Sequence, residues 1–147
     1  MAITESGLYV QNFVDMMDAT QLAFNYISDA MNCALVDNTA TPNFTTNTAW
    51  ADVSAAEITG TGYTAKGAVL GTKTLTATGG AINFDAADAS WTTATITARA
   101  AVILDDTLAS PLDALICLLN FGSDITSTAG TFTVQFAAGG FIQIPHV

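Results

Sequence analysis

The alternation of apolar and polar residues in short runs that end at turn residues is the strongest constraint on the fold. The clearest run, residues 73–78, reads Lys-Thr-Leu-Thr-Ala-Thr and is followed by Gly79 and Gly80. Successive side chains of a β-strand point to opposite faces, so this period of two predicts a strand with one buried and one wet face. The β-branched threonines suit such a half-wet surface, and the paired glycines predict a tight turn.

Similar runs recur along most of the chain and predict an all-β domain. Turn signals separate them about every 8–12 residues, as in sandwiches and small barrels. We therefore predict a mainly β fold over residues 21–147, an antiparallel β-sandwich or small barrel of about eight strands. Residues 95–104 and 114–121 are the most apolar runs and are predicted to be central. The predicted strands cover residues 22–26, 31–36, 73–78, 81–84, 95–104, 114–121, 130–136 and 141–144.

A longer period near the N-terminus predicts one helix. Apolar residues recur there at spacings of three and four, which places them in one stripe along a helix. We predict an amphipathic helix over residues 6–20, with Ser6 as its N-cap and with Asp15 and Asp18 on the wet side. Together with the β-region, this helix makes residues 1–147 a single domain. The stripe consists of Leu8, Val10, Phe13, Val14 and Met17.

Side chains that usually carry acid–base or nucleophilic chemistry are scarce in this chain. Of its residues 50% are hydrophobic and 11% charged, and it has one histidine, two cysteines, two lysines and one arginine. A Ser/His/Asp triad would need His146, which lies where chain ends fray. Cys33 and Cys117 lie in apolar runs and are predicted to be buried thiols. Gly60-x-Gly62 lacks the third glycine of a dinucleotide motif, so that motif fails. From the scarcity of reactive side chains we expect no enzyme, and we expect no cofactor.

Two acidic pairs are candidate metal sites. Asp85 and Asp88 supply several oxygens, but their spacing fits a calcium loop poorly, and an Asx-turn is the favoured interpretation. Asp105 and Asp106 end an apolar run, and the sequence supplies no partner that would complete an acid pair or a metal site. We therefore predict structural turns at both places and no metal site.

The net charge limits the classes of partner. A formal charge of −10 argues against binding to nucleic acid or to an anionic membrane, since both require basic residues. No apolar run approaches the roughly 18 residues of a membrane span, and no basic and apolar leader precedes the domain. We therefore expect folding in the cytoplasm. The mean hydropathy of +0.43 then indicates that apolar surface is buried against other chains.

A set of short motifs is spread over nearly the whole chain. They are Gly7-Leu8-Tyr9, Thr41-Pro42-Asn43-Phe44, Glu57-Ile58-x-Gly60-Thr61-Gly62-Tyr63, Phe84-Asp85-Ala86-Ala87-Asp88, Asp105-Asp106-Thr107 and Asn120-Phe121-Gly122. By these motifs the chain resembles small structural proteins encoded among the head and tail genes of tailed bacteriophages and prophages, notably those of actinobacteria. The resemblance implies a capsid accessory (decoration) protein, with a minor tail protein as the competing assignment, and it implies no catalytic residues.

These expectations combine into one functional hypothesis and one alternative. The first is a capsid decoration protein that folds in the host cytoplasm and binds the major capsid protein on the virion surface as a homo-oligomer, with a trimer favoured. Its predicted interface is Leu8, Phe13 and Met17 of the helix with Pro42 and Phe44 of the long irregular stretch 37–56. The alternative is a tail-associated or receptor-binding protein that contacts glycans through aromatic residues, although aromatic residues scattered over a sandwich more often belong to its core and rim. These aromatic residues are Trp50, Trp91, Tyr63, Phe44 and Phe141.

Overall fold

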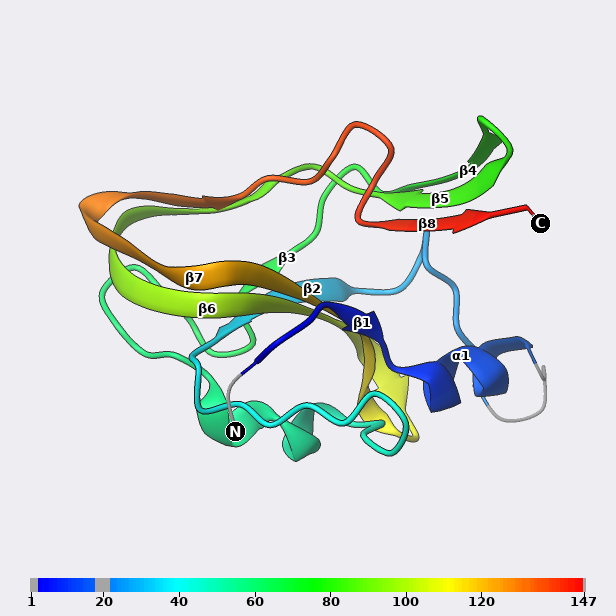
Figure 1. Cartoon of the computed structure of the whole chain (residues 1–147), viewed down its shortest axis with the longest axis horizontal. Coiled ribbons are helices and arrows are strands. Elements are labelled where there is room, and N and C mark those ends of the chain that lie inside the picture. The colour runs from blue at the N-terminus through cyan, green and yellow to red at the C-terminus, as the bar shows by residue number, and fades with distance from the viewer. Residues whose placement is uncertain (1–2, 18–21, 147) are drawn as a thin grey trace.

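The computed structural model describes residues 3–17 and 22–146 as two antiparallel β-sheets with one N-terminal α-helix (Figure 1). The elements are β1 (Gly7–Leu8), α1 (Val10–Met17), β2 (Met31–Val36), the 3-10 helices η1 (Trp50–Asp52) and η2 (Ser54–Ala56), β3 (Ala68–Val69), β4 (Thr74–Thr78), β5 (Ala81–Asp85), β6 (Ala89–Ala109), β7 (Leu112–Val134) and β8 (Ile142–Pro145). The large sheet has the strand order β1-β7-β6-β2-β3, and the small sheet has the order β4-β5-β8. The predicted mainly β, sandwich-like fold is confirmed, and the sheets do not close into a barrel.

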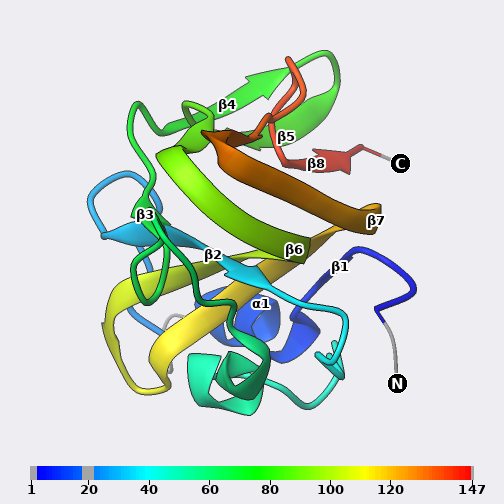
Figure 2. The ribbon, with the colours of Figure 1, turned by 90° about the vertical axis from the view of Figure 1, so that its left-hand side faces the viewer.

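The hairpin of β6 and β7 supplies both layers of the sandwich. The two strands are 21 and 23 residues long, whereas the sequence predicted separate strands over 95–104, 114–121 and 130–136. Their pairing shifts register at several points, among them Ala94/Ile96 and Ala98/Ala100. Such bulges bend a strand and increase its twist. The outer half of the hairpin, residues 89–98 and 125–134, consequently curls back over the inner half, residues 100–109 and 112–120 (Figure 2).

The inner half of this hairpin and β2 form a sheet that is buried on both faces. All six residues of β2 are buried, and β6 lies between β2 and β7. One core cluster fills the space between the layers, and a second lies between the sheet and the irregular stretch 37–56. Burial on both faces explains why these strands are continuously apolar, and it confirms the two predicted central strands. Cys33 and Cys117 are free, buried thiols, as predicted.

The predicted strand at residues 22–26 is wrong. The segment leads into a turn in which the Asn25 side chain accepts hydrogen bonds from the backbone N–H groups of Ile27 and Ser28, at 3.2 Å each. The Tyr26 hydroxyl donates to the backbone oxygen of Asp85 at 2.5 Å, which holds the buried ring under β5. Local side-chain hydrogen bonds therefore override the alternating pattern. Strand β2 pairs instead with β6 and β3.

The predicted helix is shorter than residues 6–20. Gly7 and Leu8 form β1, which pairs with β7 opposite Leu118 and Cys117, because the edge of β7 offers backbone hydrogen bonds there. Ser6 is not an N-cap: its hydroxyl accepts a hydrogen bond from the Asn120 backbone N–H at 2.8 Å. Asp15, predicted to lie on the wet side, is half-buried, and Asp18 lies outside the described residues.

The predicted hairpin at residues 73–84 is confirmed. Strands β4 and β5 pair without a register shift around the Gly79–Gly80 turn, and β8 joins β5 from the other side. The loop predicted over 137–140 precedes β8 as expected. The small sheet therefore stands at the upper end of the molecule, beside the outer half of the long hairpin (Figure 1).

Candidate interaction surface

Helix α1 is fixed to the large sheet through a polar side chain. Asn12 is fully buried, and its Nδ2 donates to the backbone oxygens of Thr48 at 2.6 Å and of Leu115 at 2.7 Å. The neighbouring Phe13 ring meets the Phe84 ring edge-on, with centroids 6.4 Å apart. These contacts tie α1 to the irregular stretch, to β7 and to the small sheet. The helix is thus rigidly placed although it has only eight residues.

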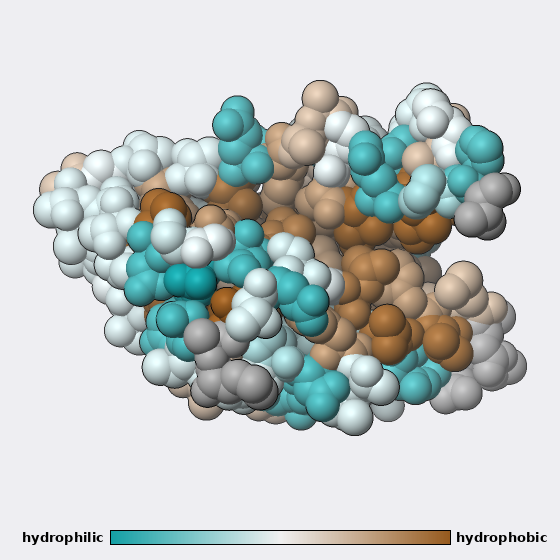
Figure 3. Space-filling model, in the orientation of Figure 1, coloured by the Kyte–Doolittle hydropathy of each residue, from teal (hydrophilic) through white to brown (hydrophobic). Residues whose placement is uncertain are grey.

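The rest of the predicted apolar stripe faces outward. Val10 is 47% exposed, Val14 55% and Met17 79%, while Phe13 is half-buried. Figure 3 shows apolar residues over α1 and on the facing underside of the small sheet. The helix therefore presents an apolar surface on a fixed support. The sequence predicted Phe13 and Met17 of this stripe as interface residues, but it did not indicate that Asn12 is the side chain that faces the core.

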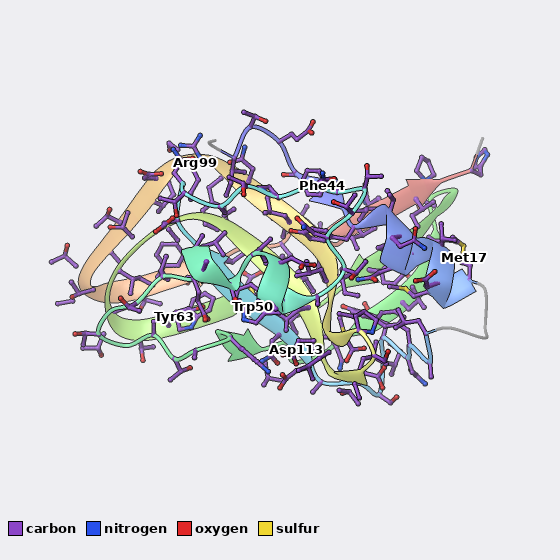
Figure 4. All side chains as sticks on the ribbon, turned by 90° about the horizontal axis from the view of Figure 1, so that it is seen from below. Met17, Phe44, Trp50, Tyr63, Arg99 and Asp113 are labelled. Carbon is purple, nitrogen blue, oxygen red and sulfur yellow. The ribbon has the colours of Figure 1, made fainter. Side chains whose placement is uncertain are left out.

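The remaining predicted interface residues lie near the start of α1. The Phe44 ring packs against Tyr9 with centroids 5.4 Å apart, and its backbone oxygen accepts a hydrogen bond from the Val10 N–H at 2.9 Å. Pro42 is half-buried in the same loop, and Leu8 is half-buried in β1. Figure 4 shows Met17 at the other end of the helix from Phe44. The structure thus places Phe44 beside β1 and the start of α1, whereas Phe13 packs on the small sheet and Met17 lies at the other end of the helix.

A groove that sequence reasoning missed opens along the free edge of β7. Beyond Leu118 this edge has no partner strand among the described residues, and the two halves of β7 separate around a cavity of about 480 Å³. Ring pairs line it, Phe121 with Phe132 at 6.2 Å and Phe136 with Phe141 at 5.0 Å between centroids. The groove depends on the curl of the hairpin, which the sequence did not predict.

The five aromatic residues weighed for glycan binding are not brought together. Trp50 and Trp91 are buried in different core clusters, as the core interpretation expected. The Tyr63 hydroxyl donates to Glu57 at 2.9 Å and accepts from the Leu35 backbone N–H at 3.0 Å. Among the five, Phe141 lines the β7 groove. No exposed aromatic platform for a sugar results from these positions within the described part of the chain.

The three basic side chains are all held by acidic residues or backbone oxygens. Lys66 bridges Asp106 at 2.7 Å and Asp113 at 2.8 Å, and Arg99 contacts Asp124 at 3.5 Å. The Lys66 ammonium lowers the pKa of the Asp106 carboxyl by its hydrogen bond. Lys73 donates to a backbone oxygen of the turn before β2. The remaining acidic residues are therefore uncompensated and leave the surface negative.

Asp85 ends β5, and Asp88 lies in the loop before β6. The turn predicted at Asp105 and Asp106 is wrong, because β6 continues its pairing there, with Asp105 opposite Met31 of β2 and Ala114 of β7. Asp85 accepts a hydrogen bond from the Ala86 N–H, and Asp88 accepts one from the Phe136 N–H, both at 2.9 Å. The second bond ties the loop before β6 to Phe136, which lines the groove. Across residues 3–17 and 22–146, no group of three His, Cys, Asp or Glu side chains could hold a metal ion. The backbone N–H of His146 donates to the Gly80 oxygen at 2.8 Å, so this histidine lies at the tip of the small sheet.

Asp105 is a buried carboxyl whose charge opposes folding near neutral pH. Its Oδ1 accepts from the Thr107 N–H at 2.8 Å, while its Oδ2 is buried without a hydrogen-bond partner in the described structure. Burial, with the nearby carboxyl of Asp29 as a smaller cause, raises the pKa of Asp105 to about 6. Because the folded state binds this proton more tightly than the unfolded state, the contribution of Asp105 to stability is fully present below about pH 4 and is lost as the pH rises to about 6.

We predict that Asp105→Asn removes this loss. Relative to the parent protein, the variant should gain about 2 kcal/mol of unfolding free energy between pH 4 and pH 7, since a raised pKa is worth about 1.4 kcal/mol per unit. The measurement is urea unfolding at both pH values. Asp124→Asn, at an exposed position, is the matched control and should show no such gain. An equal response of the two variants would contradict the prediction.

Comparisons with protein-family models, with curated proteins and with solved structures find no match for this chain. Among residues 3–17 and 22–146, no helix has both the length and the apolar character needed to cross a membrane.

Proposed function

We propose that this protein is a non-enzymatic virion structural protein that decorates the capsid by binding the shell of major capsid protein. The observation that carries the proposal is the exposed apolar face of α1, made of Val10, Val14 and Met17, on a helix that Asn12 fixes in place. An apolar helix face of this kind docks in a groove of a partner protein. The proposal that this partner is the major capsid protein rests on the resemblance of the sequence motifs to those of phage structural proteins.

The physical role of such a protein is to add contact area across the joints of a shell. A single contact of α1 covers few apolar residues, and burying each is worth about 1.5–3 kcal/mol before the cost of association. The lattice compensates for the weak binding of a single contact, because every shell presents the same site many times. Neighbouring copies then raise each other's effective concentration. We propose that copies gather as trimers on the shell after folding in the host cytoplasm.

The competing proposal is a minor tail or receptor-binding protein. The two differ in copy number, since a shell component is present at a simple ratio to the major capsid protein and a tail component in a handful of copies. Quantitative band intensities from purified particles distinguish them. A ratio of one to one or one to two supports decoration, and a handful of copies per particle supports the tail.

The contribution of α1 is tested with Val14→Glu/Met17→Glu. Both side chains are exposed, so the fold should be retained, while two carboxylates in the apolar contact should weaken binding to purified shells at least a hundredfold. The measurement is co-sedimentation with shells assembled without this protein. Point substitutions are preferable to deleting the helix, because β1 and Asn12 belong to the fold.

The matched control is Val69→Glu/Leu112→Glu. It adds the same charge at two exposed apolar positions, one on β3 and one at the start of β7. Binding of this control should equal that of the parent protein. If both double variants bind shells with unchanged affinity, α1 is not the contact; if both lose binding equally, added charge alone explains the loss.

A further inference from the structure

Strand β4 is a sheet edge without the usual protection. It is the first strand of the small sheet, all five of its residues are exposed, and its pairing with β5 has no bulge. Its sequence, Thr-Leu-Thr-Ala-Thr, contains neither charge nor proline. Natural edges are normally blunted by a lysine, a proline or a bulge, because a bare edge pairs with another strand. Strand β4 is therefore available for strand addition.

The small sheet also lies in the acid-free part of a strongly acidic chain. None of the thirteen acidic residues falls between Glu57 and Asp85 or after Asp124. Strands β4, β5 and β8 come from these two stretches, and Asp85 at the end of β5 is their only charged residue. Two copies that each carry −10 repel over most of their surfaces, and this sheet is where they can approach at least electrostatic cost.

The face of the small sheet adds an apolar contact to the free edge. Leu75, Phe84 and Ile142 form one row across the three strands, and Ala77, Ile82 and Ile144 form the next. Phe84 and Ile142 are covered by the core, whereas Leu75 and Ile82 are 47% exposed and Ile144 is 38% exposed. The uncovered row lines a hollow of about 340 Å³ at the tip of the sheet.

We propose that a second copy of this chain adds its own β4 to this edge, antiparallel and centred on Thr76. A two-fold axis perpendicular to the sheet then makes one six-stranded sheet from two small sheets and keeps both apolar faces on the same side. Leu75 of one copy lies beside Ala77 of the other, so the apolar rows continue across the junction. This contact requires no shell, and it therefore goes beyond the proposed function.

The first test is sedimentation equilibrium of the full chain between 1 and about 300 µM. A five-residue edge makes a small interface, so we expect a reversible monomer–dimer equilibrium typical of weak contacts. Thr76→Lys places two ammonium groups opposite each other at the axis and should weaken dimerisation at least tenfold. Thr92→Lys, on an exposed position of β6, makes the same change in charge and should leave dimerisation unchanged.

The second test traps the contact. Thr76→Cys should form an intermolecular disulfide under mild oxidation, since residues paired across an antiparallel junction lie within disulfide reach. Thr92→Cys should not, and the native thiols are buried. A protein that stays monomeric at every concentration, or a dimer that Thr76→Lys does not weaken, overturns the proposal. Neither result bears on shell binding, which is measured separately through α1.

Discussion

Replacing Gly67 by alanine is expected to lower the free energy of unfolding by about 3 kcal/mol, roughly a hundredfold in the folding equilibrium. Gly67 has φ +72°, a conformation that costs an alanine about 1 kcal/mol. An added Cβ would also strike the backbone oxygen of Cys33 and lie 2.7 Å from the Ala34 Cα. These atoms belong to β2, in the fully buried centre of the sheet, and cannot move aside without disturbing its pairing with β6. Strand β3 must therefore detach.

Two other glycines separate the causes of this effect. An added Cβ at Gly71 meets nothing within 4 Å and has no unusual φ, so Gly71→Ala should be nearly neutral. Gly79 has φ +62° with equally open surroundings, so Gly79→Ala isolates the conformational cost of about 1 kcal/mol. Urea unfolding of the three variants measures the difference. A Gly67→Ala variant no less stable than Gly79→Ala would show that β3 yields to the new side chain.

The sequence predicted elements where a single local rule decides them. The hairpin of β4 and β5 follows from strict alternation and paired glycines, and β2 from a short apolar run. Residues 22–26 show the limit, because their alternation is also compatible with a turn once Asn25 and Tyr26 find hydrogen-bond partners. Gly7 and Leu8 continue a helical stripe in sequence, yet an open edge of β7 takes them as a strand. Such competition is decided by tertiary contacts, not by local pattern.

The sequence predicted that α1 carries an apolar contact surface, but it did not predict which side of the helix faces the core. The stripe of α1 indicated apolar contact, and the exposed Val14 and Met17 retain that character. Which side faces inward was set by a single asparagine, a residue type that pattern reasoning assigns to the wet side. The Phe-lined groove depends on register shifts within β6 and β7, and these leave no mark that one sequence reveals. The free edge of β4 likewise becomes meaningful only when its neighbours are known.

Asn12→Asp is expected to lower the free energy of unfolding by about 4 kcal/mol at neutral pH. The asparagine Nδ2 donates to two backbone oxygens, and a carboxylate of the same shape can donate to neither. The substitution thus places a buried negative charge against two backbone oxygens that are also acceptors. A buried charge without a partner costs several kcal/mol. At pH 4 the protonated acid regains one donor, so part of the stability should return.

The same substitution separates the helix from the rest of the fold. Asn12 joins α1 to Thr48 and Leu115, so its loss should release α1 before the central sheet unfolds, and the shell binding that we propose for α1 should fall with it. Gln11→Glu is the matched control: it adds the same charge one residue away on the exposed side, where the Gln11 side chain donates a hydrogen bond to Asp15. We expect its stability to change by less than about 0.5 kcal/mol. Denaturant unfolding at pH 7 and pH 4 measures both variants, and equal destabilisation would mean that Asn12 does not anchor the helix.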